Sequence, residues 1–183
     1  MVSIFFFFWF MVILFGVIGA MRGWAKEILV SFSVIIALFI VTLLENYVPF
    51  FRVFQENPDA GNVKYIFWIR TGLVGLLAFF GYQTPSLQRF VASEKFNRER
   101  LQDSLLGFVL GSLNGFLIVG TILFYMHQSG FPYPNLISAP PPGGEVEASL
   151  NQLVTYLPPR WLGIPGIYFA VAIAFIFVIV VFI

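Results

Sequence analysis

The sequence predicts an all-α protein, a polytopic transmembrane helix bundle with five spans, of which the first two form a tight hairpin. Hydrophobic residues make up 59% of the chain and charged residues only 10%, against roughly 45–50% and about 25% in ordinary soluble domains. Two apolar runs, residues 2–21 and 28–44, each approach the roughly 20 residues that a helix needs to cross a bilayer. Only residues 22–27 separate them, which leaves room for nothing longer than a tight turn at one membrane face. A soluble fold is excluded.

Two further apolar segments predict the third and fourth spans. Residues 65–82 are apolar except for Arg70, and residues 105–126 carry no charge. The loop at residues 45–64 is rich in turn formers, and residues 48–54 within it are expected to lie along the membrane interface. Between the third and fourth spans, a cap followed by proline predicts a short interfacial helix near residues 85–100.

The chain changes character after the fourth span. Residues 131–144 are rich in proline and end in two glycines, so they predict an irregular linker. Residues 162–183 are then apolar throughout and follow Trp161, which has the position of an interfacial aromatic belt. Counted from Gly166, this fifth span would rise about 27 Å as a helix, slightly less than the hydrocarbon thickness.

Lysine and arginine predict the orientation, because cytoplasmic loops carry an excess of both. Six fall at the first turn and in the connector between spans three and four: Arg22, Lys26, Arg89, Lys95, Arg98 and Arg100. Three fall on the opposite side: Arg52, Lys64 and Arg160. We therefore expect the N-terminus outside and the C-terminus inside. The chain then divides into a four-span membrane domain (residues 1–126), a proline-rich extracytoplasmic loop (127–161) and a C-terminal transmembrane helix (162–183).

Several chemistries find no support in the sequence. The chain has no cysteine, which excludes disulfides and thiolate catalysis, and its net charge of +1 excludes a strongly basic nucleic-acid binder. No nucleophile with a basic partner, metal-ligand cluster or phosphate loop is recognisable, so we expect no enzyme and no cofactor. The sole histidine, His127, could ligate the metal of a haem or chlorophyll, but a lone histidine at a membrane boundary is more often an amphipathic boundary residue.

Span four carries a regular stripe of glycine. Gly107, Gly111 and Gly115 recur every four residues and therefore share one helix face, on which another helix can approach closely. The partner is either span one, which has its own glycines, or another subunit or a second copy of the chain. Asn114, beside the stripe, is expected to make an interhelical hydrogen bond.

Arg70 is the only charge within a predicted span, and an ionisable residue there is a functional hypothesis by default. Its long stem could carry the guanidinium to the interface, or it could pair with a carboxylate. Glu45, at the same end of span two, is the candidate partner by depth. A transport role is the third alternative.

Two short blocks carry a family resemblance. Gly19-Ala-Met-Arg22-Gly23-Trp-Ala-Lys26-Glu27-Ile28 resembles the first hairpin of the bacterial CvpA (colicin V production) family, and Asp103-Ser-Leu-Leu-Gly107, with the glycine stripe after it, resembles that family's entry into the fourth span. The resemblance covers about residues 1–126. By carry-over, Arg22, Gly23 and Glu27 would be the motif residues at the cytoplasmic turn, Asp103 the acidic lead into the fourth span, and the glycine stripe the packing face. Arg22 and Lys26 are expected to anchor the turn to anionic headgroups, with Glu27 paired to one of them.

The resemblance implies a bacterial inner-membrane protein without enzymatic activity that assists colicin export or envelope homeostasis. An alternative from another class is a small accessory subunit of a larger membrane complex, bioenergetic and either photosynthetic or respiratory. An autonomous channel or transporter is less favoured, because no inverted repeat is recognisable. The expected partners are the lipid bilayer, and other membrane subunits or a second copy bound through the glycine stripe.

Overall fold

The computed structural model describes the whole chain except residues 1–3, 57–58, 84–96, 136 and 183. Its described part is all-α and contains four long apolar helices: α1 (Ile4–Arg22), α2 (Trp24–Tyr47), α4 (Ala60–Tyr82) and α5 (Asn97–Gln128). Each of these four has the length and hydropathy of a membrane span. The first four predicted spans are therefore confirmed as helices.

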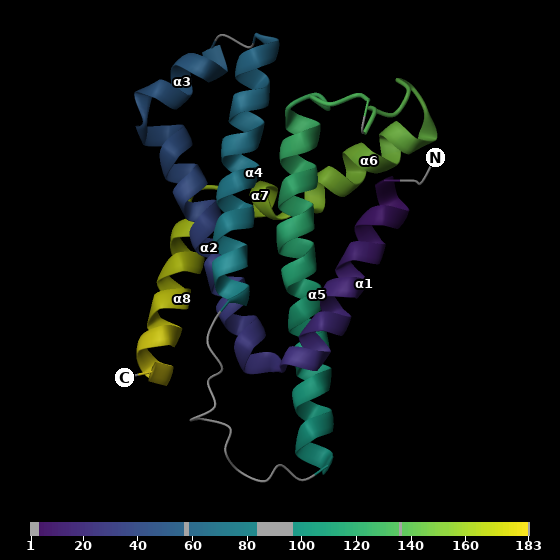
Figure 1. The fold of residues 1–183 in the computed structure, drawn as a ribbon. Helices are drawn as coiled ribbons and strands as arrows, with labels where there is room; N and C mark the ends of the chain where they lie inside the picture. Colours follow the sequence, from purple (N-terminus) through teal and green to yellow (C-terminus); the bar gives the residue numbers. More distant parts are fainter. Residues whose placement is uncertain (1–3, 57–58, 84–96, 136, 183) are drawn as a thin grey trace.

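Gly23 alone separates α1 from α2. Its φ of 86° lies in the left-handed region that glycine adopts without strain, and this reverses the chain within one residue. The two helices then diverge instead of packing along their length, and α5 lies between them (Figure 1). The prediction of a tight hairpin of two adjacent helices is confirmed. Beyond the turn, α1 packs chiefly on α5.

Helix α5 is the centre of the bundle and contacts α1, α2 and α4. Its 32 residues rise about 48 Å, more than a hydrocarbon core requires, and its first turns project beyond the α1–α2 turn (Figure 1). We call this the turn end of the bundle. The loop end is the opposite one, where α2 and α5 finish and α4 begins.

Shorter helices complete the described structure: α3 (Pro49–Glu56), α6 (Glu145–Tyr156), α7 (Pro158–Trp161) and α8 (Gly166–Phe182). Helix α3 overlaps residues 48–54, the segment expected at the interface. Residues 131–144 are irregular where the structure describes them, as predicted, but α6 and α7 were not predicted. Helix α6 buries Leu150 in a cluster with Phe8 and Val12 from the N-terminal half of α1, and α7 buries Pro158 beside Gly120 of α5.

Helix α8 is 17 residues long and is not among the four helices with the length of a span. It begins inside the bundle, because Leu162 and Ile167 belong to a buried cluster with Val34 of α2 and Leu117 of α5. From there it runs along α2 towards the turn end (Figure 1). The fifth predicted span is thus a helix, but it is shorter than predicted and starts inside the bundle, between the loop end and the turn end.

The interfacial helix expected near residues 85–100 falls mostly outside the described residues, which resume at Asn97. Residues 97–100 form the first turn of α5. That part of the expected surface helix is therefore continuous with the fourth long helix.

Candidate functional site at the turn end

Glu27 is fully buried one turn into α2, which is an unusual place for a carboxylate in an apolar bundle. Such a group is tolerated only when it is paired and hydrogen-bonded. Arg22, the last residue of α1, provides the charge partner, with its Nη1 2.6 Å from Glu27 Oε1. The expected pairing of Glu27 with a basic residue of the turn is therefore confirmed, and the partner is Arg22.

Asn114 of α5 provides the second set of contacts. It is fully buried, and its Nδ2 donates to Glu27 Oε2 at 2.8 Å and to the Glu27 carbonyl oxygen at 2.9 Å. Ser31 Oγ, one turn further along α2, lies 2.7 Å from Asn114 Oδ1 and donates to it. Asn114 therefore makes the interhelical hydrogen bond expected of it, and both ends of its amide are used.

Tyr82, the last residue of α4, completes the arrangement. Its hydroxyl donates to Glu27 Oε2 at 3.5 Å, and its carbonyl oxygen accepts from Arg22 Nη2 at 2.9 Å. The Arg22 guanidinium also lies 4.4 Å from the Tyr82 ring centroid, within the range of a cation–π interaction. We call Arg22, Glu27, Ser31, Tyr82 and Asn114 the polar cluster. It draws one or more residues from each of the four long helices.

The polar cluster balances its own charge and hydrogen bonds. Its one positive and one negative side chain are in contact, and both amide ends of Asn114 and both oxygens of Glu27 have partners. In hydrocarbon, separating such groups leaves donors and acceptors unpaired at a cost of several kcal/mol each. The cluster therefore favours one relative position of the four helices at the turn end.

Asp103 of α5 stabilises the turn between α1 and α2. A Cβ at Gly23 would lie 3.0 Å from Asp103 Oδ1, and the backbone N–H of Trp24 donates to the same oxygen at 3.3 Å. The carboxylate thus supplies negative charge and an acceptor at the N-terminus of α2, where both are stabilising. The adjacent Ser104 Oγ donates to the Ala20 carbonyl oxygen at 3.0 Å.

The glycine stripe of α5 packs on α1. A Cβ at Gly107 or Gly111 would run into the α1 backbone at Gly19 or Phe15, and one at Gly115 would lie 2.8 Å from Phe15 Cβ. Side chains on this stripe are therefore incompatible with the observed contact. Of the alternatives predicted for the stripe, span one is confirmed as its partner. The expectation that the stripe binds another subunit or a second copy is wrong, because α1 of the same chain covers it.

Arg70 lies at the loop end and is only 5% exposed. Its Nε is 2.6 Å from Glu45 Oε1, and its Nη1 donates to Gln128 Oε1 at 2.9 Å. The pairing with Glu45 is confirmed. The alternative, in which the Arg70 side chain reaches out to the interface, is wrong, because the side chain is buried.

The remaining candidates have simpler surroundings. Lys26 lies half-buried in the first turn of α2, and no ion pair involves it in the described part of the chain. His127 places Nε2 2.9 Å from Asn151 Oδ1 of α6, so this nitrogen serves a contact between helices. Within the described residues, no group of three or more histidine and acidic side chains is arranged to hold a metal ion.

Ser31 and Tyr82 were not singled out from the sequence. Ser31 follows Glu27 by four residues and so shares its helix face, which is a signal that the spacing alone contained. Tyr82 carried no such signal, since an aromatic residue at the end of a span is ordinarily an interface anchor.

The fold and the cluster together define a polytopic α-helical membrane protein held together by buried polar contacts. The model of the family described as "Colicin V production protein" matches residues 6–139, which is most of the chain. The chain therefore belongs to the colicin V production (CvpA) family. No curated protein and no solved structure matches it.

Proposed function

We propose that this chain is a non-enzymatic inner-membrane protein that assists export or envelope homeostasis, and that its polar cluster holds the four long helices in the working arrangement. The observation that carries the proposal is the fully buried Glu27, which contacts side chains from α1, α4 and α5 at once. Membership of the colicin V production family supports the biological setting.

The same proposal gives the turn end a cytoplasmic position. Arg22 and Lys26 lie at this end, and Arg100 is exposed on the part of α5 that projects beyond it. Basic residues gathered at one end favour the side facing the cytoplasm and its anionic lipids. Helix α8 would then be a partial fifth span, since its 17 residues rise about 25 Å from a start inside the bundle towards the cytoplasmic face.

A complementation experiment tests the function. A bacterium that lacks its own CvpA-family protein would express this chain, and colicin V export and resistance to detergent would be measured. We expect the unaltered chain and Asn135→Leu, at an exposed position, to restore both properties. Asn114→Leu, which removes the amide from the polar cluster, should restore neither although it reaches the membrane.

Two results would contradict the proposal. Full restoration by Asn114→Leu would show that the polar cluster is dispensable for function. Failure of the unaltered chain, together with a stoichiometric partner complex that co-purifies in mild detergent, would support an accessory subunit instead.

A further inference from the structure

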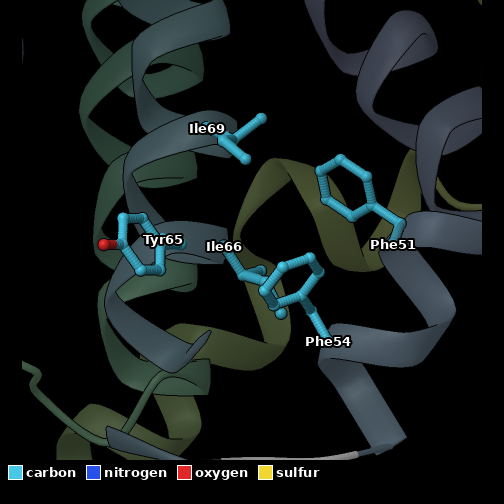
Figure 2. Close-up of a pocket in the computed structure, with 5 residues that line it drawn as sticks. All are labelled: Phe51, Phe54, Tyr65, Ile66 and Ile69. Carbon is cyan, nitrogen blue, oxygen red and sulfur yellow. The ribbon is translucent and has the colours of Figure 1, made fainter. Parts of the chain in front are cut away.

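Two cavities adjoin at the loop end, far from the polar cluster. One has a volume of about 250 Å³ and is lined by apolar and aromatic side chains of α3 and α4, namely Phe51, Phe54, Tyr65, Ile66 and Ile69 (Figure 2). The other is open, has a volume of about 440 Å³ and is lined mainly by polar side chains, among them Glu45, Arg70 and Gln128, together with Phe54 and Ile66. Phe54 and Ile66 line both, so the two cavities are neighbours with a common wall.

Helix α3 creates the apolar cavity. Figure 2 shows Phe51 and Phe54 of α3 facing Ile66 and Ile69 of α4 across it. Ile69 is also 39% exposed on the outer surface of α4, which places it between the cavity and the surrounding bilayer. An alkyl chain could therefore enter from the lipid side.

The polar cavity presents opposite charges side by side. Glu45 and Arg70 form an ion pair, yet the Glu45 side chain is still 28% exposed. Arg70 directs Nε towards Glu45, donates from Nη1 to Gln128 and lies 5.3 Å from the Tyr125 ring centroid. Its Nε and Glu45 Oε1 are buried without a well-oriented hydrogen bond, and both side chains line the cavity. A ligand that satisfies both groups needs an anionic part for the guanidinium and a cationic part for the carboxylate.

We propose that these adjoining cavities bind one zwitterionic phospholipid with a primary ammonium group, of the phosphatidylethanolamine class. Its phosphate contacts Arg70, its ammonium donates to Glu45, and part of one acyl chain occupies the cavity between α3 and α4. The cavities lie where the long helices α2 and α5 end, which is the depth of lipid headgroups. An anionic lipid without an amine would bring its charge beside Glu45 unpaired, so the charge pattern favours the zwitterion.

Native mass spectrometry of the full-length protein tests the proposal. The protein would be purified in detergent, stripped of lipid, and titrated separately with phosphatidylethanolamine and phosphatidylglycerol of identical acyl chains. We expect phosphatidylethanolamine to bind about tenfold more tightly, because charge-assisted hydrogen bonds to both headgroup charges form only with it. In Glu45→Gln/Arg70→Gln this preference should fall to about onefold, with the two lipids bound alike.

A matched pair of variants tests the acyl cavity. Ile69→Trp places a bulky ring at the cavity and should weaken phosphatidylethanolamine binding about tenfold by excluding the acyl chain. Leu76→Trp makes a comparable change two turns along the same helix, at another exposed position outside the cavity, and should leave binding unchanged. Both positions are exposed, so both tryptophan variants should fold. Comparing them therefore tests whether an acyl chain occupies the cavity even if Glu45→Gln/Arg70→Gln fails to fold.

Three results would overturn the proposal. These are equal binding of the two lipids by the unaltered protein, a preference that survives Glu45→Gln/Arg70→Gln, or equal effects of Ile69→Trp and Leu76→Trp. Each is distinct from failure of the proposed function, which depends on the opposite end of the bundle.

Discussion

At the scale of single residues, the contribution of a buried polar side chain to stability depends on its partners. Glu27 is fully buried, and Arg22, Tyr82 and Asn114 together satisfy both of its carboxylate oxygens. Removing one member of a buried ion pair typically costs about 3–5 kcal/mol, because the other charge stays buried and unpaired. Removing both members costs much less, since neither charge then remains to be compensated.

The pair Arg22 and Glu27 should therefore show strong non-additivity. We expect Arg22→Leu to lower the free energy of unfolding by about 3–5 kcal/mol. The double variant Arg22→Leu/Glu27→Leu should lose clearly less than the sum of the two single changes. Denaturant unfolding in detergent measures Arg22→Leu, Glu27→Leu and the double variant, and Arg160→Leu, at an exposed arginine, is the matched control. Additive losses would show that the ion pair contributes no coupling.

At the scale of helices, the close contact between α1 and α5 depends on glycines, which have no side chain to separate the two backbones. Gly111 of α5 lies against the α1 backbone at Phe15 and Gly19, so any side chain there pushes the helices apart. Gly75 of α4 has open space around the position of a Cβ. The same substitution at these two glycines should therefore have very different consequences.

We expect Gly111→Leu to lower the free energy of unfolding by about 1–3 kcal/mol through overpacking. Gly75→Leu should be neutral or slightly stabilising, since leucine favours a helix more than glycine does and extends into open space. Thermal unfolding of both variants in the same detergent measures the difference. If both melt alike, the close approach of α1 and α5 makes no contribution to stability.

The long helices could be located from the sequence, because the thickness of the bilayer sets the length of a spanning helix and such a helix is a long run of apolar residues. Sequence reasoning placed the first turn within residues 22–27, which the structure narrows to Gly23, and it named Glu45 as the candidate partner of Arg70 by depth. It did not place α5 between α1 and α2, because apolar periodicity does not say which helix lies beside which. It also missed α6 and α7, since the prolines of residues 131–144 favoured reading the whole segment up to Trp161 as a loop.

At the scale of the whole molecule, the two ends of the bundle differ in kind. The turn end holds the closed polar cluster, whereas the loop end holds an open polar cavity beside an apolar one. The proposed orientation assigns the turn end to the cytoplasm on the strength of its basic residues.

Single cysteines test the orientation directly, because the chain has none of its own. We expect Gly144→Cys to react with a membrane-impermeant maleimide in intact cells. Ala25→Cys, beside the turn, should react only after the membrane is permeabilised. Labelling of Ala25→Cys in intact cells would reverse the proposed topology.

The central claim is that the polar cluster fixes the relative position of the helices at the turn end. Spin labels at Met21→Cys and Gln83→Cys, both exposed and next to cluster residues on α1 and α4, report this position through electron–electron distance measurements in lipid. We expect one narrow distance distribution in this labelled protein and in its Asn135→Leu derivative. Adding Asn114→Leu should give a broad distribution shifted to longer distances, and an unchanged narrow distribution would contradict the claim.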